Sequence, residues 1–298
     1  MRKVFITGGS GTVGSTFIEK YYSMYKFYSY CRNESMQVDL KRKFPDVDII
    51  LGSVESRSSL LHHVSEVKPD IIVHAAALKH VDIAEEQPLL ATEVNIIGSF
   101  NVIRAAKENG VRTVVGISTD KACNPDNVYG HTKLIMERMF VEANFTCCRF
   151  GNVAKSHGSV IPFWLKLKEE GKKLKVTDPK MTRLMFSKSE AASLINYAID
   201  LSEVGNLGFV LSRVMKSVNL LDLAHVISNE IEVVGLRPGE KIHESLISNK
   251  EVSYSGVNEA GYIFLQKNNE DLPSLEGELS SITAEKMSQE EMELLVKG

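Results

Sequence analysis

The chain has 298 residues, of which 43% are hydrophobic, so it is long enough for one large or two modest domains with a well-buried core. Its 35 Lys and Arg residues nearly balance 38 Asp and Glu residues, and a net charge of -3 gives no support for nucleic-acid or membrane-surface binding. Neither a membrane-spanning run nor a signal peptide is visible, and the four cysteines form no CxxC pair. We therefore expect a cytoplasmic protein without a disulfide framework or a metal site.

The chain opens with a short apolar strand at residues 4–6 that leads into a glycine-rich turn. Gly8, Gly11 and Gly14 permit a tight turn, close approach of a pyrophosphate and close packing of the following helix. The amino terminus of that helix offers unpaired N–H groups and a positive dipole to phosphates. Glycine triplets are common, but one that follows a strand and precedes a helix indicates a dinucleotide site.

The second strand, residues 27–30, is followed by the residues that select the dinucleotide. An acidic residue about 20 positions after the glycines would hold the ribose hydroxyls of NAD. The residue nearest that place is Arg32, which suits the 2′-phosphate of NADP, although an arginine in a solvated loop has the same pattern. We therefore expect NADP, and Glu34 leaves NAD as the less favoured alternative.

Further strands are expected at residues 49–51, 71–74, 111–118 and 145–150, with a long helix over 88–110. Ser53, after the third strand, could bond the adenine edge, and Ala75 and Ala76, after the fourth, would let a flat cofactor lie against the sheet. The alternation of strands and helices predicts an α/β fold with a doubly wound parallel sheet of the Rossmann type. We expect a dinucleotide-binding domain over 1–152. Residues 153–298 would form mainly a smaller substrate-binding domain, with some segments returning to the first.

A polar stretch after the fifth strand, residues 118–133, carries the candidate chemistry. Thr119, Asp120 and Lys121 follow a buried strand, and ligands bind outside the carboxyl ends of such strands. Tyr129 and Lys133 are four residues apart and so share one face of a helix. A cation there would bring the tyrosine pKa below about 10, so that it could deprotonate a sugar hydroxyl. By itself, such a pair is equally typical of a protein surface.

Basic turns at residues 177–183 and 236–244 are found in the second half of the chain. Lys180, Arg183 and Arg237 suit a diphosphate, although each could equally be a surface charge. Near the end, Ser288 and Glu291 have the spacing of a capping box that opens a short helix.

The glycine loop, the HAAA run and YGHTK resemble the extended short-chain dehydrogenase/reductase superfamily, from residue 3 to about residue 247. Within it, the chain most resembles the inverting UDP-N-acetylglucosamine 4,6-dehydratases, some of which also epimerise C5. The motifs are STDKA (118–122), HAAALKHV (74–81), RFGNV (149–153), GSVIPF (158–163), TDPKMTR (177–183) and RPGEKIHE (237–244). Lys121 discriminates, because retaining sugar dehydratases carry an acidic residue there.

The resemblance implies an NADP-dependent lyase of nucleotide-sugar and polysaccharide biosynthesis. It would convert UDP-N-acetylglucosamine to a UDP-2-acetamido-2,6-dideoxy-L-hexos-4-ulose and assemble as a homo-oligomer, a hexamer or a dimer. The implied catalytic residues are Thr119, Asp120, Lys121, Tyr129 and Lys133. The implied cofactor residues are Gly8, Ser10, Gly11, Thr12, Gly14, Arg32, Ser53, Ala75, Ala76, Lys79, Tyr129 and Lys133. The implied substrate residues are Lys79, Asn152, Ser159, Val160, Thr177, Met181, Arg183, Arg237 and Glu240.

In the implied scheme, neutral Lys121 removes the C5 proton and Asp120 protonates the departing 6-hydroxyl. This requires a lowered pKa for Lys121, for which desolvation and the neighbouring cations Lys133 and Lys79 would be the cause. Two alternatives stay open. One is a UDP-sugar 4-epimerase that uses the same tyrosine and lysine, and the other is a catalytically idle NADP-binding protein.

Overall fold

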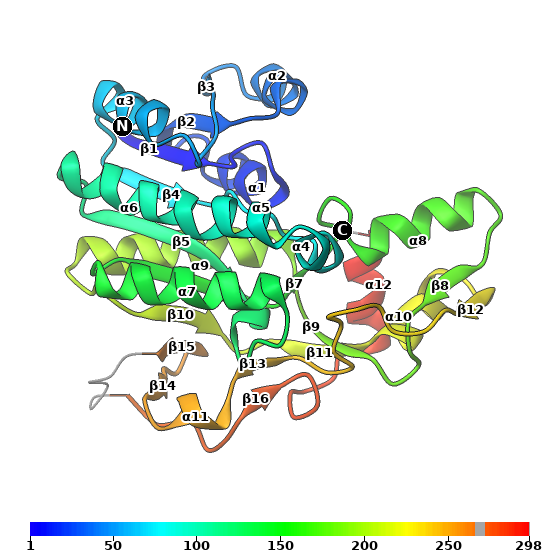
Figure 1. The fold of residues 1–298 in the computed structure, drawn as a ribbon. Helices are drawn as coiled ribbons and strands as arrows, with labels where there is room; N and C mark the ends of the chain where they lie inside the picture. The colour runs from blue at the N-terminus through cyan, green and yellow to red at the C-terminus, as the bar shows by residue number, and fades with distance from the viewer. Residues whose placement is uncertain (266–271, 298) are drawn as a thin grey trace.

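The computed structural model describes residues 1–265 and 272–297, which form a larger and a smaller lobe (Figure 1). Within this part of the chain, the main sheet has nine strands in the order β14-β15-β10-β6-β5-β4-β1-β2-β3. Its mutually parallel strands are β1 (Arg2–Thr7), β2 (Tyr25–Cys31), β3 (Asp48–Leu51), β4 (Ile71–His74), β5 (Thr113–Thr119), β6 (Thr146–Phe150) and β10 (Val210–Arg213). The antiparallel strands β15 (Tyr262–Leu265) and β14 (Ser255–Val257) extend it past β10.

The strand order confirms the doubly wound parallel sheet predicted from the sequence. It reverses between β1 and β4, and in such folds this switch point is where ligands bind. β4 is buried along its whole length, and β5 nearly so, as expected of strands covered on both faces.

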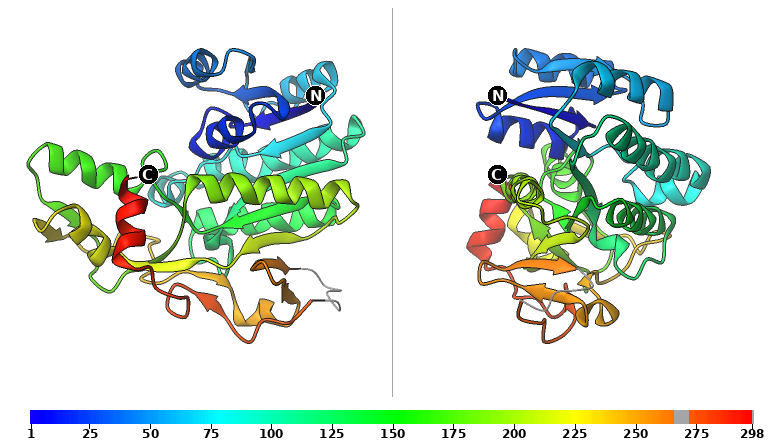
Figure 2. Two further views of the ribbon diagram at one scale, coloured as in Figure 1. Left: turned by 180° about the vertical axis from the view of Figure 1, so that it is seen from behind. Right: turned by 90° about the vertical axis from the view of Figure 1, so that its left-hand side faces the viewer.

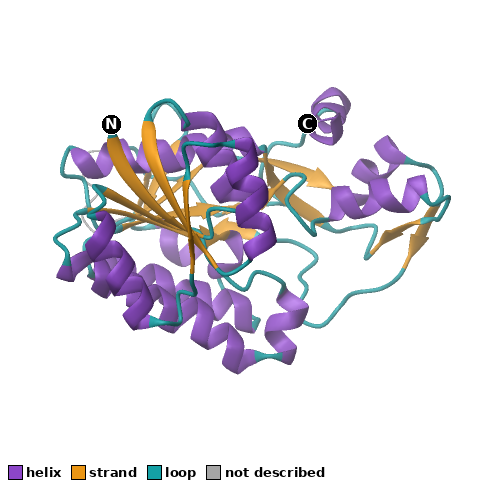
Figure 3. Ribbon diagram, turned by 90° about the horizontal axis from the view of Figure 1, so that it is seen from above, coloured by secondary structure: helices purple, strands orange, loops and turns teal. Residues whose placement is uncertain are grey.

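Helices cover both faces of the sheet, as Figures 2 and 3 show. One face carries α1 (Thr12–Tyr21) and α9 (Lys188–Glu203), and the other carries α3 (Arg57–Val67), α6 (Gly98–Glu108) and α7 (Val128–Glu142). α2 (Glu34–Lys43) packs against β2 and β3, and the short α4 (Val81–Glu86) lies beside α7. Side chains of Asn33, Asn127 and Ser187 cap α2, α7 and α9. No helix in the described part of the chain has the length and apolarity that a membrane crossing requires.

The helix predicted over residues 88–110 is interrupted. The structure divides it into α5 (Pro88–Thr92), a π-helical turn η1 (Glu93–Ile97) and α6. Asn95 in this turn is buried, and its side chain accepts a hydrogen bond from Leu78 N at 2.8 Å and donates one to Leu78 O at 3.0 Å. We assign the interruption to this bonding with the segment after β4. It could not be predicted from the sequence, because apolar periodicity does not record a side-chain bond to a distant loop.

The smaller lobe is built from the second half of the chain around its own core. Its elements are β7 (Asn152–Val153), α8 (Val160–Glu169), β8 (Leu174–Val176), β9 (Thr182–Phe186), β11 (Lys216–Asn219), α10 (Leu220–Ile227), β12 (Ile231–Val233) and α12 (Gln289–Lys297). Trp164 is buried at the centre of this core, and its indole N–H donates to Lys175 O at 2.8 Å. Reciprocal bonds between Ser288 and Glu291 confirm the predicted capping box before α12.

β13 (Ser245–Ile247) pairs with β16 (Leu279–Ser280), and Leu246 and Ile247 pack into the core of the larger lobe; α11 (Asn249–Val252) follows β13. The predicted domain boundary at residue 152 stays a prediction.

Candidate active site

A cavity of about 560 Å³ opens at the carboxyl ends of the parallel strands. Its wall is formed by the segments that follow β1 to β6, and residues of the smaller lobe close the opposite side. All the predicted cofactor residues line it: Gly8, Ser10, Gly11, Thr12, Gly14, Arg32, Ser53, Ala75, Ala76, Lys79, Tyr129 and Lys133.

The glycine loop leaves no room for side chains where the phosphates of a dinucleotide would lie. Gly8 has a φ of +72°, and a Cβ on it would lie 2.7 Å from Ala76 N. A Cβ on Gly14 would lie 2.6 Å from Gly8 O. Ser10 Oγ is buried and has no hydrogen-bond partner among the described residues. Tight backbone, an unpartnered hydroxyl and the amino terminus of α1 fit a bound pyrophosphate.

Arg32 and Ser53, which were predicted to select the dinucleotide and to bond its adenine, line the cavity beside the glycine loop. The Arg32 side chain is 57% exposed, and its Nη1 lies 3.5 Å from Glu55 Oε1. The Ser53 hydroxyl also donates to the Glu55 carboxylate. Arg32 is therefore accessible to a ligand, while the bond that was predicted from Ser53 to adenine would have to compete with Glu55.

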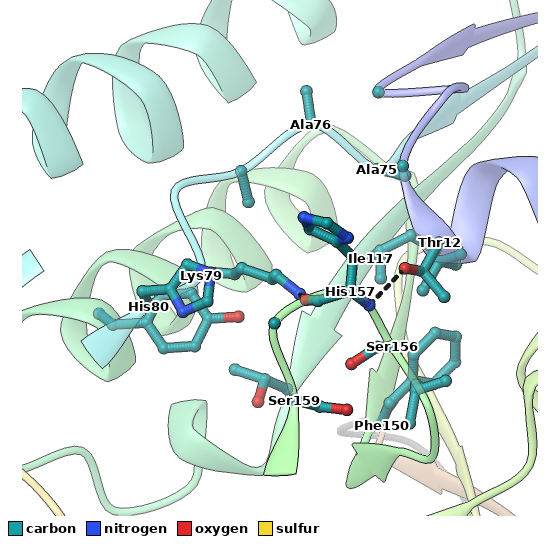
Figure 4. A pocket seen from close by; sticks show the side chains of 18 of the residues that line it. Thr12, Ala75, Ala76, Lys79, His80, Ile117, Phe150, Ser156, His157 and Ser159 are labelled. Carbon is teal, nitrogen blue, oxygen red and sulfur yellow. Dashed lines mark hydrogen bonds between the residues drawn. The ribbon is translucent and has the colours of Figure 1, made fainter. Parts of the chain in front are cut away.

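A loop at the start of the smaller lobe lies against the glycine loop (Figure 4). The backbone N–H of His157 donates to Thr12 Oγ1 at 2.9 Å, and the Lys79 ammonium donates to His157 O. Burial lowers the pKa of Lys79. This loop therefore contacts the segments that follow β1 and β4. It forms part of the cavity wall where the two lobes meet.

Tyr129 lies in the first turn of α7, where the side chain of Asn127 accepts from Gly130 N at 2.8 Å. The predicted lowering of its pKa is wrong for this structure: burial raises the pKa of Tyr129 to about 12. The Lys133 ammonium lies 2.9 Å from Met136 Sδ on the same helix, and burial lowers the pKa of Lys133 to about 8. The cation that acts on the phenol is Lys121, whose charge opposes the rise in the Tyr129 pKa.

Lys121 is held between two buried carboxylates. Its Nζ lies 3.0 Å from Asp120 Oδ1 and 3.3 Å from Glu244 Oε1. The predicted lowering of the Lys121 pKa is also wrong: burial alone would lower it, but the charges of Asp120 and Glu244 outweigh burial and raise it. The Thr119 hydroxyl donates to Asp120 Oδ1 at 2.9 Å, so that carboxylate oxygen accepts from both sides.

Most of the predicted substrate residues line the same cavity: Lys79, Asn152, Ser159, Val160, Arg183, Arg237 and Glu240. Thr177 and Met181 do not appear in the described lining. Met181 is buried in the core of the smaller lobe, and Thr177 accepts a backbone hydrogen bond from Gly235 N at 3.1 Å. The Arg183 guanidinium donates to the backbone carbonyls of Thr182, Lys241 and Ile242. Lys180, the other cation predicted near a diphosphate in this turn, is exposed and is not among the described residues that line the cavity.

Sequence reasoning missed Glu244, Glu55 and His157 as lining residues. Glu244 had one signal, its position at the end of the RPGEKIHE segment, but nothing in the sequence pairs it with Lys121, more than a hundred residues earlier. Glu55 and His157 carry no pattern that separates them from ordinary loop residues.

Three comparisons with known proteins agree on the relationship. Residues 4–265 match a family described as polysaccharide biosynthesis protein. A Campylobacter jejuni protein (subsp. jejuni serotype O:2), named UDP-N-acetylglucosamine 4,6-dehydratase (inverting), is 37% identical over 267 residues, which cover 84% of this chain and 78% of that protein. A UDP-glucose 4-epimerase of Rickettsia massiliae is 32% identical over 273 residues, which cover 85% of this chain and 79% of that protein. The X-ray structure of Pen from Bacillus thuringiensis is similar with a TM-score of 0.91 and 30% identity, over 99% of this chain and 97% of that one.

Proposed function

Because the chain belongs to the polysaccharide biosynthesis protein family, we propose that it is an inverting 4,6-dehydratase of UDP-N-acetylglucosamine, with epimerisation at C5. The observation that carries this proposal is the lysine after Asp120: Lys121 reaches the same cavity as Tyr129 and Lys133. An amine at this place supplies the acid-base group that dehydration needs and simple epimerisation at C4 does not.

The dinucleotide would be held tightly in the cradle formed by Gly8, Gly14 and Ser10. The exposed guanidinium of Arg32 supports NADP in preference to NAD, because it could bond a 2′-phosphate. When bound, the dinucleotide would accept a hydride from sugar C4, return one at C6 and bring a positive charge into the cavity. A cation close to Tyr129 would lower the tyrosine pKa from about 12, as Lys121 already does in part.

The acid-base steps fall to residues of this chain. The Tyr129 hydroxyl would exchange a proton with the sugar 4-hydroxyl, and Thr119 would bond the same region of the sugar. Lys121 would take the C5 proton, and Asp120 would protonate the departing 6-hydroxyl. Asp120 Oδ2 is buried without a hydrogen-bond partner among the described residues, which suits a carboxyl that exchanges a proton with substrate. Arg183 and Arg237 line the part of the cavity where a diphosphate would enter.

The alternative is a UDP-sugar 4-epimerase, favoured by the Rickettsia relative of that name. Tyr129 and Lys133 would suffice for it. Mass spectrometry of the products formed from UDP-N-acetylglucosamine separates the two, since a dehydratase product has lost water and an epimerase product keeps the substrate mass. A product of unchanged mass would replace our proposal with the epimerase, and no product would favour an idle dinucleotide-binding protein.

We also propose a homo-oligomer, a dimer or a hexamer, in the cytoplasm. Exposed apolar side chains on neighbouring helical segments support an interface: Ile97 at the end of η1, Phe100 on α6 and Ile135 on α7 are 46%, 44% and 44% exposed. All four cysteines carry free thiols, as is usual in a reducing compartment. Light scattering that reports a monomer at working concentration would reject the assembly.

A further inference from the structure

Glu244 reaches the Lys121 ammonium, and no predicted role included this residue. We propose that Glu244 is a positioning residue that takes up the ammonium proton of Lys121, so that Lys121 becomes the neutral amine needed for C5 proton transfer. This inference rests on the proposed dehydratase function. It explains how a lysine that the protein keeps charged can act as a base.

Two hydrogen bonds to Ser281 hold Glu244, which directly precedes β13. Its backbone N–H donates to Ser281 Oγ at 2.9 Å, and its backbone carbonyl accepts from Ser281 N at 2.8 Å. Ser281 directly follows β16, the partner of β13, so both sides of Glu244 are tied to this small sheet. The side chain therefore has a fixed origin from which to reach Lys121.

The Glu244 carboxylate is buried, and only one of its two oxygens has a partner. Glu244 Oε1 lies 3.3 Å from Lys121 Nζ, while Oε2 is buried and has no hydrogen-bond partner among the described residues. Glu244 is 3% exposed, yet it belongs to the cavity lining. A buried carboxylate with one free oxygen has capacity to accept a proton that an already saturated carboxylate lacks.

Burial and the charge of Asp120 favour a proton on Glu244, whereas the charges of Lys121 and Arg183 oppose it. Asp120 and Lys121 face Glu244 from the turn after β5, Arg183 from β9, and Tyr129 faces Lys121 from α7. Arg183 is engaged with three backbone carbonyls, so Lys121 is the cation that meets the Glu244 carboxylate directly. Burial raises the pKa of Glu244, which makes the carboxyl a better proton acceptor than an ordinary glutamate. Moving the proton replaces a buried ion pair with a neutral acid and a neutral amine.

The step balances without any further reactant. An N–H bond of the Lys121 ammonium breaks, and an O–H bond forms on Glu244 Oε1. The freed amine pair then takes the C5 proton, and the C5–H electrons pass toward the 4-ketone. Asp120 cannot also take up this proton if it is the acid for the 6-hydroxyl, because it must then already carry the proton that it donates, on its unpartnered Oδ2, while its Oδ1 accepts from Thr119 and Lys121.

The test is deuterium exchange at C5 of the 4-keto product, isolated from the wild-type reaction and returned to enzyme in deuterated water. C5 lies next to the ketone, so exchange reports the Lys121 step without dehydration. In the wild type we expect exchange to fall at low pH as Glu244 becomes protonated, and to be flat above that. In Glu244→Gln we expect loss on the order of 10²-fold at neutral pH, with KM little changed, and recovery as pH rises, because Lys121 must then release its proton to solvent.

Two further comparisons separate proton uptake from structure. Glu244→Asp and Glu244→Asn remove the same methylene, but only Asp can accept the proton, so Asp should keep the wild-type pH profile and Asn should not. Glu278→Gln is the matched control, since Glu278 accepts from Ser245 beside Glu244 but does not line the cavity. It should exchange like the wild type. Equal pH profiles for wild type, Gln and Asn would overturn the role of Glu244 alone. Failure of the wild type to form any dehydrated product would overturn the proposed function, and this inference with it.

Discussion

Burial and neighbouring charge set the protonation of each residue around the cavity, in ways that spacing does not show. Tyr129 and Lys133 do share a helix, as their spacing predicts, but the Lys133 ammonium lies against Met136 Sδ. Burial of the Tyr129 phenol raises the pKa of Tyr129 to about 12. Lys121 could be identified from its neighbours in sequence. The raised pKa of Lys121 could not be predicted, because Glu244, which raises it together with Asp120, comes from a distant segment of the chain.

The first prediction concerns Tyr129. Tyr129→Phe removes only the hydroxyl from a buried ring, so folding and dinucleotide binding should persist. Turnover should fall by at least ~10²-fold, the usual scale for a positioned acid or base. Steady-state kinetics with UDP-N-acetylglucosamine measures this, and a variant of nearly full activity would remove Tyr129 from the scheme.

His74 gives a prediction about pH. It is buried at the end of β4, with Nδ1 2.7 Å from Thr7 Oγ1 and Nε2 2.9 Å from Ser99 Oγ. Burial lowers the pKa of His74 to about 3 from an ordinary value of 6.5. Between these values the unfolded chain binds the proton and the folded protein does not, so stability falls as pH falls, by about 1.4 kcal/mol per pH unit.

We therefore expect His74→Gln to remove this part of the slope in urea unfolding measured between pH 6.5 and pH 4. His225→Gln, on the exposed face of α10, should keep the wild-type slope. If His74→Gln unfolds with the same pH dependence as the wild type, His74 does not stay neutral in the fold.

At the scale of elements, a buried ion cluster ties three segments together. Arg149 on β6 lies 2.7 Å from Glu137 of α7 and 2.9 Å from Glu251 of α11. Arg149 and Glu137 are each 1% exposed, so removal of the cation would leave two carboxylates buried and unpaired. The cluster fixes α7, which carries Tyr129 and Lys133, against β6.

Arg149→Met should therefore lower the free energy of unfolding by ~3–5 kcal/mol. The control is Arg2→Gln, which breaks a partly exposed pair with Glu203 and should cost no more than ~1 kcal/mol. Urea denaturation compares them, and similar losses for the two variants would contradict the assigned role of the cluster.

Elements with strong local signals could be predicted. β1, β4 and β5 are short apolar runs that precede polar or glycine-rich turns, and the residues predicted to bind the cofactor line one cavity at the resulting sheet edge. The π-helical turn at η1 could not, because it depends on a side-chain bond between Asn95 and Leu78. Met181 and Thr177 belong to the expected motif, yet neither lines the cavity in the described part of the chain, and Met181 is buried in the core of the smaller lobe.

On the scale of the whole molecule, the cavity requires both lobes. The sequence indicated that the second half returns to the first, but not that β10, β14 and β15 extend the main sheet or that the segment before β13 brings Glu244 to Lys121. Such pairings link residues far apart in sequence and have no local pattern.

The cradle formed by the glycine loop, together with a cofactor that would be recycled within each turnover, predicts that purified protein carries its dinucleotide without any being added. Denatured wild-type protein should release NADP or its reduced form. Arg32→Ala should reduce the preference for NADP over NAD roughly tenfold or more, since a charge-assisted bond to phosphate is worth about 1.5–3 kcal/mol. Chromatography of the released nucleotide measures both, and NAD from the wild type would overturn the role of Arg32.

The central claim is that this protein removes water from UDP-N-acetylglucosamine and inverts C5 through Lys121, and incubation of that sugar in deuterated water tests it most directly. The wild type should yield a 6-deoxy-4-keto product with deuterium at C5 in the L-configuration, and Lys121→Ala should yield none of it. A wild-type product of unchanged mass, or normal product from Lys121→Ala, would contradict the account.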